Sequence, residues 1–136
     1  MTPDEARARF QGESIARLAT VGAGGRPHLV PIVFAIEGDA VYSAVDHKRK
    51  RSQRLKRLDN IRRNPQVAVL VDRYDDDWSR LWWVRADGTA RVIEHGEEFD
   101  GAARILVRKY EEYARRPPAG PVIAIDIDAW SGWSAE

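Results

Sequence analysis

The sequence contains no cysteine among its 136 residues. This absence excludes disulfides, thiolate nucleophiles, zinc-finger sites and cysteine-ligated iron–sulfur clusters. The three histidines, His28, His47 and His95, lie far apart in the sequence and show no metal-ligand spacing. The sequence therefore predicts no metal site.

Long apolar runs are also absent. No stretch approaches the roughly 20 apolar residues of a membrane-spanning helix, and the N-terminal region lacks the apolar stretch of a signal peptide. We therefore expect a cytoplasmic protein without a membrane partner. With 43% apolar and 32% charged residues, the composition is that of a soluble globular protein, and its length suits a single domain over residues 1–136.

The sequence carries none of the short motifs that identify common enzyme classes. It has no GxGxxG or GxxxxGKS/T phosphate-binding loop and no GxSxG nucleophile elbow. Its neighbouring carboxylates lie in predicted turns or on the solvent face of a predicted strand, so no catalytic residue is predicted. An enzyme with so few candidate acids and bases would take its chemistry from a bound cofactor.

Positive charge is concentrated in one segment, His47 to Arg63. Nine of the 22 Lys and Arg residues lie in these 17 positions, with a single acid, Asp59, while 13 basic and 20 acidic residues make up the rest. Lys, Arg and free helix N–H groups all favour anions, so the segment predicts a phosphate or carboxylate ligand. The simpler alternative is a solvated helix face.

Three helices are predicted. Thr2 and Glu5 form a capping box for the first, which ends near Gly12. The second carries the basic segment and ends at Asn64-Pro65. The third runs from Glu97 to about Arg115, and its apolar stripe includes Phe99, Ala102, Ala103, Leu106, Tyr110 and Tyr113.

Short strands are predicted over residues 15–21, 28–36, 40–45, 66–72, 81–86, 89–94 and 122–129, with a turn or bulge at Asp87-Gly88. In the last, Ile123, Ile125 and Ile127 are expected to point inward. Pro31 stands in the middle of the second strand, which predicts a bulge or an open edge, because proline removes a ladder donor. Hairpin-linked strands with helices at the start, middle and end predict a mainly β, antiparallel barrel with flanking helices.

Tryptophan is frequent, with five residues in the chain. Trp82 and Trp83 are adjacent in a predicted strand and must point to opposite faces. One is expected in the core, and the other exposed, at an interface or on a ligand. Trp130 and Trp133 are more typical of interface packing than of ligand contact.

The segment ATVGAGGRPHLVPIVFAIEGDAVYSAV, the basic stretch after it and LxRLxNIRRNPQVAVLVD resemble the FMN-binding split β-barrel superfamily. The pattern is most similar to its pyridoxamine 5'-phosphate oxidase-like (PPOX class) branch of deazaflavin (coenzyme F-420)-dependent enzymes, and DDDWSRLWWVRADGTARV matches one subgroup. The resemblance covers roughly residues 14–95. It implies a homodimer with two cofactor sites in grooves at the dimer interface.

The resemblance also implies the residues of the cofactor site. The ring would be lined by Pro31, Ile32, Val33 and Phe34, and the phosphate would be held by Lys48, Lys50 and Arg51. An anionic cofactor tail would run along the surface past Arg54, Lys56, Arg57 and Arg62. Trp78, Ser79 and the Trp82-Trp83 pair would lie across the groove, contributed by the partner chain.

These expectations combine into a functional prediction. The chain would be a coenzyme F-420-dependent oxidoreductase that transfers hydride between the cofactor and an organic small-molecule substrate. Three alternatives stay open: an FMN-dependent oxidase or reductase, a cofactor carrier without turnover, and a nucleic-acid-binding module that uses the basic helix and exposed Trp. Nucleic acid is disfavoured because the acidic remainder of the chain would repel a long polyanion.

Overall fold

The computed structural model describes the backbone of residues 1–45 and 51–136, and the side chains of residues 1–45 and 56–136. Seven strands form one antiparallel sheet in the order β2-β1-β5-β6-β7-β4-β3. The strands are β1 (Ala16–Val21), β2 (Pro27–Ile32), β3 (Ala35–Glu37), β4 (Ala40–Ala44), β5 (Gln66–Arg73), β6 (Trp82–Ile93) and β7 (Val122–Ser134). This confirms the mainly β, antiparallel class that the hairpin-linked strands predicted.

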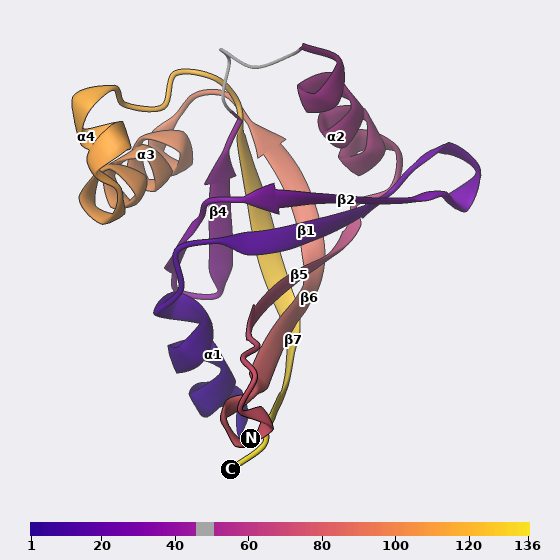
Figure 1. The fold of residues 1–136 in the computed structure, drawn as a ribbon. Coiled ribbons are helices and arrows are strands. Elements are labelled where there is room, and N and C mark those ends of the chain that lie inside the picture. The colour runs from indigo at the N-terminus through magenta and orange to yellow at the C-terminus, as the bar shows by residue number, and fades with distance from the viewer. Residues whose placement is uncertain (46–50) are drawn as a thin grey trace.

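β2 and β3 are the two edges of the sheet although they follow one another in the chain. Only Val33 and Phe34 separate them, so the sheet has to curl until its two edges approach each other. Figure 1 shows β1 and β2 crossing in front of β4, β6 and β7 at a steep angle. We call residues 33–34 the corner. The curled sheet is the split barrel that the resemblance implied, and the corner replaces the continuous strand predicted over residues 28–36.

Four α-helices flank the barrel, namely α1 (Pro3–Gln11), α2 (Arg51–Arg63), α3 (Glu97–Lys109) and α4 (Glu111–Arg115). The predicted capping box is confirmed, because the Glu5 amide donates to Thr2 Oγ1 (3.1 Å) and the Thr2 amide donates to Glu5 Oε2 (3.0 Å). Among the described residues, no helix is long and apolar enough to cross a membrane.

The helix predicted from Glu97 to Arg115 is divided at Tyr110, so that prediction was wrong at this position. Tyr110 has extended backbone, with φ −123° and ψ 126°. Its hydroxyl accepts a hydrogen bond from the Phe34 amide (3.0 Å) and lies 2.8 Å from the Ser14 carbonyl oxygen, to which it can donate. A tertiary contact with the corner therefore accompanies the break, and helical periodicity alone cannot reveal it.

The last two strands also differ from their predictions. β6 is continuous where two strands were predicted, and of the turn or bulge expected at Asp87-Gly88 the structure has a β-bulge against β7. A side chain at Gly88 would collide with the carbonyl oxygen of Asp126, which explains the glycine. β7 is longer than predicted and does not alternate at its start, because residues 122–125 are all buried. One face of this stretch points into the barrel and the other is covered by α3.

Two separate apolar clusters result from this arrangement. The larger fills the barrel, where the Phe10 ring of α1 lies 4.8 Å from the Phe34 ring and 5.2 Å from the Trp130 ring, measured between centroids. The smaller lies between α3 and the β3–β4–β7 part of the sheet and is built on Ala35, Ala44, Ala102, Ile105, Leu106 and Val122. The protein thus has two apolar cores, one inside the barrel and one between α3 and the sheet.

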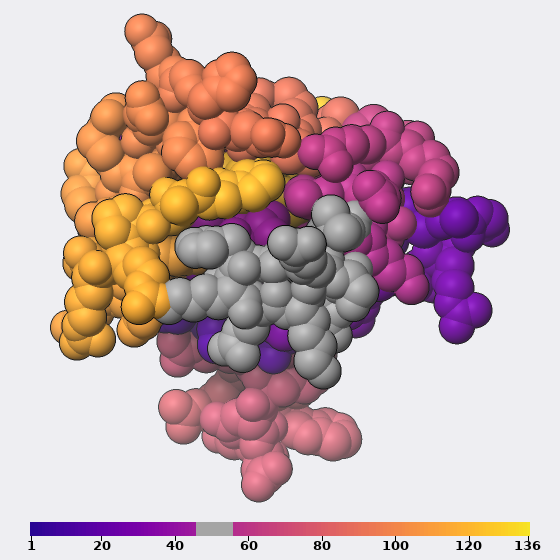
Figure 2. Space-filling view, turned by 90° about the horizontal axis from the view of Figure 1, so that it is seen from above, coloured from indigo at the N-terminus to yellow at the C-terminus, as the bar shows by residue number. Residues whose placement is uncertain are grey.

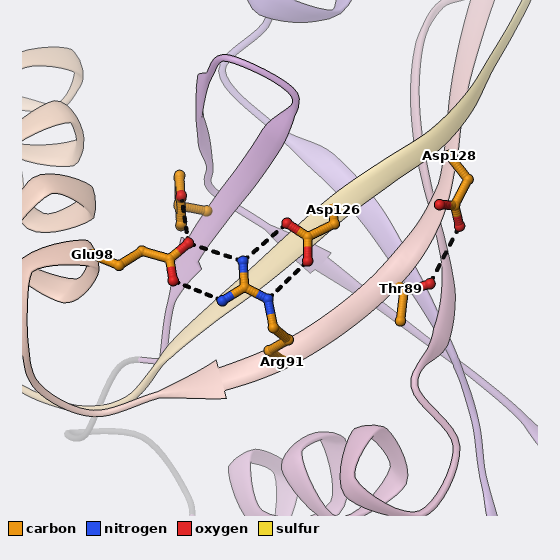
Figure 3. Close-up of polar contacts among 6 residues, drawn as sticks. Thr89, Arg91, Glu98, Asp126 and Asp128 are labelled. Atoms are coloured by element: carbon orange, nitrogen blue, oxygen red, sulfur yellow. Dashed lines mark hydrogen bonds and ion pairs between the residues drawn. The ribbon is translucent and has the colours of Figure 1, made fainter.

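A charged cluster anchors α3 to the sheet beside the smaller core (Figure 3). Arg91 of β6 makes a pair of hydrogen bonds to Glu98 of α3 (2.7 and 2.9 Å) and a second pair to Asp126 of β7 (2.8 and 2.9 Å). The Tyr42 hydroxyl of β4 donates to Glu98 (2.8 Å). These bonds hold the pKa of the Glu98 carboxyl at about 2, and burial together with the Glu98 bond raises the pKa of Tyr42 to about 12.

Candidate functional site

The exposed edge of β2 is the first part of the candidate site. Pro31 pairs only with Arg17 of β1, and its strand is the last one on that side of the sheet. A proline without a ladder N–H is tolerated at such an edge. The prediction that Pro31 marks an open edge is therefore confirmed. The edge leaves a stretch of backbone and apolar side chains accessible to a ligand.

The four residues expected to line a cofactor ring differ in accessibility. Pro31 is exposed and Val33 is half-buried, whereas Ile32 is 5% exposed and Phe34 is fully buried. Phe34 contributes its ring to the barrel core, and its backbone N–H already donates to Tyr110. Pro31 and Val33 are thus the two side chains of this segment that a ligand can reach directly, and the ring-lining role of all four stays a prediction.

The corner beside this edge is held rigidly. The Ser43 hydroxyl donates to the Val33 carbonyl (2.8 Å), and the Tyr110 hydroxyl lies 2.9 Å from the Phe34 carbonyl. The Lys109 ammonium sits 3.7 Å from the centre of the Phe34 ring. Burial lowers the pKa of Lys109 to about 8. Sequence reasoning missed Lys109, because nothing in a helical repeat marks one lysine as folded back over an aromatic ring.

The basic segment is described only in part. Lys48 and Lys50 lie outside the described residues, and of Arg51 and Arg54 only the backbone is described. That backbone confirms the predicted helix, since α2 begins at Arg51, a few residues after β4. The phosphate contacts expected of Lys48, Lys50 and Arg51, and the contact of Arg54 with the cofactor tail, therefore remain predictions.

Within one chain, Trp78 and Ser79 lie at the end of the barrel away from the Pro31 edge. They belong to a short 3₁₀ turn (Trp78–Arg80) between β5 and β6, and Trp78 is 78% exposed. The Ser79 amide and hydroxyl both donate to Asp77 Oδ1 (3.1 and 2.6 Å), which lowers the pKa of Asp77. Figure 1 shows the β5–β6 loop near both termini, away from β2. A single chain does not bring Trp78 to the Pro31 edge.

Trp82 and Trp83 point to opposite faces of β6 as predicted, but both are half-buried. Trp82 packs against the barrel core and lies under the guanidinium of Arg9, 5.2 Å from the ring centre. Trp83 stands on the other face, where Arg85 covers it at 5.9 Å and Trp133 is its partner on β7. The sequence showed the alternation of the two rings but not the arginine that covers each.

A polar cleft of about 640 Å³ opens near Trp82, and no prediction had covered it. It is lined by Arg9, Arg17, Asp72, Arg73, Tyr74, Asp75, Arg80, Trp82 and Glu136. Each of its four arginines is ion-paired, with N–O distances of 3.4 Å (Arg9–Glu136), 3.6 Å (Arg17–Asp72), 3.1 Å (Arg73–Glu13) and 3.6 Å (Arg80–Asp75). The cleft is therefore polar, and each of its arginine charges is already offset by a carboxylate.

Within residues 1–45 and 56–136, no group of three or more His, Asp or Glu side chains could hold a metal ion. In this part of the chain the titratable side chains of Lys109 and Tyr110 pack on the corner, and the Tyr110 hydroxyl is already hydrogen-bonded to the Phe34 backbone. Chemistry at this edge would have to come from a bound cofactor, with the protein supplying position and shielding from water.

Comparison with known proteins gives a consistent family. The family model described as pyridoxamine 5'-phosphate oxidase matches residues 2–134. A 5a,11a-dehydrotetracycline/5a,11a-dehydrooxytetracycline reductase of Streptomyces rimosus subsp. rimosus is 34% identical over 63 residues. That match covers 46% of this chain and 43% of the reductase, so the chain matches less than half the length of this curated relative.

Solved structures share the whole fold. A conserved hypothetical protein from Mycobacterium tuberculosis superimposes with a TM-score of 0.80 at 20% identity, covering 100% of this chain and 86% of that one. An FAD-binding protein from Mesorhizobium loti superimposes with a TM-score of 0.71 at 20% identity, covering 97% and 92%. At these identities the likeness establishes the architecture.

Proposed function

The chain belongs to the pyridoxamine 5'-phosphate oxidase family, and from this membership we propose that it is an oxidoreductase with a flavin-type cofactor. When bound, such a cofactor accepts or donates a hydride. The further step in the proposal is that the cofactor is the deazaflavin coenzyme F-420 and that the other reactant is an organic small molecule. The similarity to a reductase supports the reaction class.

The open β2 edge is the observation that carries the proposal. Pro31 and Val33 give an apolar, accessible surface, and the corner beside them is fixed by Ser43 and Tyr110. A planar ring needs such a flat, rigid wall more than it needs a side-chain acid, because hydride transfer depends on position and exclusion of water. The basic helix α2 follows β4 directly and supplies cations for anionic groups on the cofactor.

A homodimer is part of the proposal, because one chain leaves an apolar surface uncovered. The register of β2, β1, β5, β6 and β7 places Leu29, Leu70 and Trp133 on one side of the sheet, the outer face, where they are 67%, 37% and 45% exposed. The ion pairs Arg17–Asp72 and Arg85–Asp87 leave this face without net charge. Two copies could therefore pack face to face without repulsion.

Replacing both Leu29 and Leu70 with glutamate is expected to produce monomers. Each substitution occurs twice in a symmetric dimer, so the loss should exceed about 2 kcal/mol, or roughly thirtyfold in the dissociation constant. Analytical ultracentrifugation over a concentration series measures this. Arg108→Glu on α3 adds negative charge away from the outer face and should leave the dimer intact. A wild-type protein that is monomeric at all concentrations would overturn the dimer proposal.

Side-by-side titration with FMN and coenzyme F-420 tests the cofactor. We expect F-420 to bind more tightly, and Lys50→Ala to weaken it by about tenfold or more, since a charge-assisted hydrogen bond contributes about 1.5–3 kcal/mol. Arg116→Ala, which removes a cation near the end of α4, should leave the affinity unchanged. Protein that purifies with tightly bound FMN and ignores F-420 would overturn the deazaflavin proposal and favour a flavin, as the similarity to an FAD-binding structure suggests.

A further inference from the structure

Basic side chains gather where α2 packs beside the β1–β2 hairpin. Figure 2 shows α2 beside this hairpin when the molecule is viewed from above. His28 of β2 and Arg57 of α2 are both half-buried there, and Lys56 is exposed next to them. Lys56 and Arg57 act on His28 electrostatically, and together with burial they lower the pKa of its imidazole. Three cationic or potentially cationic groups thus face one place.

Two atoms in this region, His28 Nδ1 and Arg57 Nε, are buried and have no hydrogen-bond partner among the described residues. Their neighbours show that the region is otherwise well paired. Asn60 Nδ2 donates to Thr20 Oγ1 (3.1 Å), and Arg62 on the same helix pairs with Glu94 (3.5 Å). Buried polar groups in native proteins are nearly always paired, so two unpaired atoms on residues that interact electrostatically require an explanation.

The charge of Arg57 is also uncompensated. Among the described residues no carboxylate forms an ion pair with Arg57 or Lys56, and burial alone lowers the pKa of the Arg57 guanidinium. A half-buried guanidinium without a counterion destabilises the folded chain, whereas a paired one is tolerated. The described residues therefore supply no negatively charged group to offset this cation.

We propose that His28, Lys56 and Arg57 form a binding site for an oxyanion, either a carboxylate or a phosphate. The resemblance had implied that Lys56 and Arg57 lie on the surface beside a cofactor tail, and the sequence had predicted no role for His28. The structure instead leaves Arg57 half-buried, with its Nε atom and His28 Nδ1 both buried, so the site has a side that is shielded from water. A partly buried cation binds an anion more firmly than separate exposed cations do, because water screens its charge less.

The position of the site indicates which molecules it selects. Arg57 lies six residues after Arg51, where α2 begins, which corresponds to about 9 Å along the helix axis. A ligand whose first phosphate is held at the start of α2 would therefore place a second anionic group here. FMN has only one phosphate, while FAD has a diphosphate and coenzyme F-420 has a phosphodiester followed by carboxylates. The assignment of the first phosphate rests on the proposed function, but the oxyanion site itself does not.

The site is tested first without any cofactor. Inorganic phosphate or glutarate, added to the ligand-free protein, should raise the pKa of the His28 imidazole, followed by NMR, because a bound anion offsets Lys56 and Arg57. Arg57→Met should abolish this response, and Arg63→Ala, which removes a charge from an exposed position on the same helix, should retain it. An unchanged His28 titration in wild-type protein at tens of millimolar of either anion would overturn the site.

The second test compares FMN, FAD and coenzyme F-420 on wild type, Arg57→Met and Arg63→Ala. Arg57→Met should weaken the ligands with a second anionic group by about tenfold to a hundredfold and change FMN by less than about twofold. Equal losses for FMN and for the larger ligands would overturn the selectivity. If no flavin or deazaflavin binds the wild type, the proposed function fails while the His28 response still decides the site.

The melting temperature of Arg57→Met provides a separate check on the argument from the unpaired charge. Because Arg57 is uncompensated in the free protein, Arg57→Met should leave the melting temperature unchanged or raise it. A clearly lowered melting temperature would show that Arg57 has a structural partner and would overturn the argument from the unpaired charge. Lys56 is exposed, so Lys56→Ala serves as the second variant for the anion titration. We expect it to lose part of the anion-induced rise in the His28 pKa.

Discussion

Phe34→Ala should lower the free energy of unfolding by about 3–5 kcal/mol, which is the range for removing a fully buried aromatic side chain. The Phe34 ring is 0% exposed and contacts Phe10 on one side, while Lys109 covers it from α3. Losing the ring would leave a cavity at the corner where the two edges of the sheet are joined. Urea unfolding followed by circular dichroism measures the change.

A matched control for Phe34 is Phe99→Ala. Phe99 is half-buried on α3 and packs on the smaller core, so its removal should cost clearly less. We also expect Phe34→Ala to raise the pKa of Lys109 toward its ordinary value, because the ammonium would gain access to water in the cavity. If Phe34→Ala and Phe99→Ala destabilise the protein equally, the corner has no special role in stability.

Arg91→Met should destabilise the protein by about 2–3 kcal/mol at neutral pH, because it leaves Glu98 and Asp126 without the guanidinium that joins them. Figure 3 shows this guanidinium between the two carboxylates, with one edge turned to each. Methionine keeps much of the length of the side chain, so the loss reports on the charge-assisted hydrogen bonds. Arg115→Met, which breaks two exposed pairs at 3.6 and 4.0 Å on α4, should change stability by less than about 0.5 kcal/mol.

The same cluster predicts how stability changes in acid. The pKa of Glu98 falls from 4.5 to about 2 on folding. Its contribution is therefore complete above pH 4.5 and is lost as the pH falls toward 2. Glu98 is 39% exposed, so we discount the effect for solvent screening to about 1–2 kcal/mol. Unfolding curves between pH 5 and pH 2 should show this loss in the wild type and a smaller one in Arg91→Met.

Local chemistry allowed much of the fold to be predicted. The capping box at Thr2 and the edge position of Pro31 follow from hydrogen-bond rules that hold within a few residues. The break at Tyr110 was missed because it depends on a contact with the distant corner. At Asp87-Gly88 the sequence allowed a turn or a bulge, and only the pairing with β7 shows that it is a bulge. Burial of residues 122–125 on both faces likewise depends on where α3 packs.

The candidate site was predictable where it depends on composition. A cluster of Lys and Arg at the start of a helix indicates an anion without knowledge of the fold. His28 was missed because its importance comes from what lies near it in the fold. Strand β2 is 25 or more residues before Arg57 in the chain, and only the packing of α2 on the hairpin brings the two together. Lys109 was missed for the same reason, since a repeat of apolar positions does not indicate how a polar neighbour folds back.

The geometry of β2 determines which parts of this chain can change in length. Val33 and Phe34 join strands at opposite edges, so one added residue there would shift both edges in register and turn side chains of β3 from core to solvent. The turn before β2 is different: Gly24 and Gly25 adopt positive φ values of 70° and 82° in a loop that projects beyond the barrel (Figure 1). Natural variants of this protein should therefore accumulate insertions in that loop and none at the corner, and a reporter sequence is best placed between Ala23 and Arg26.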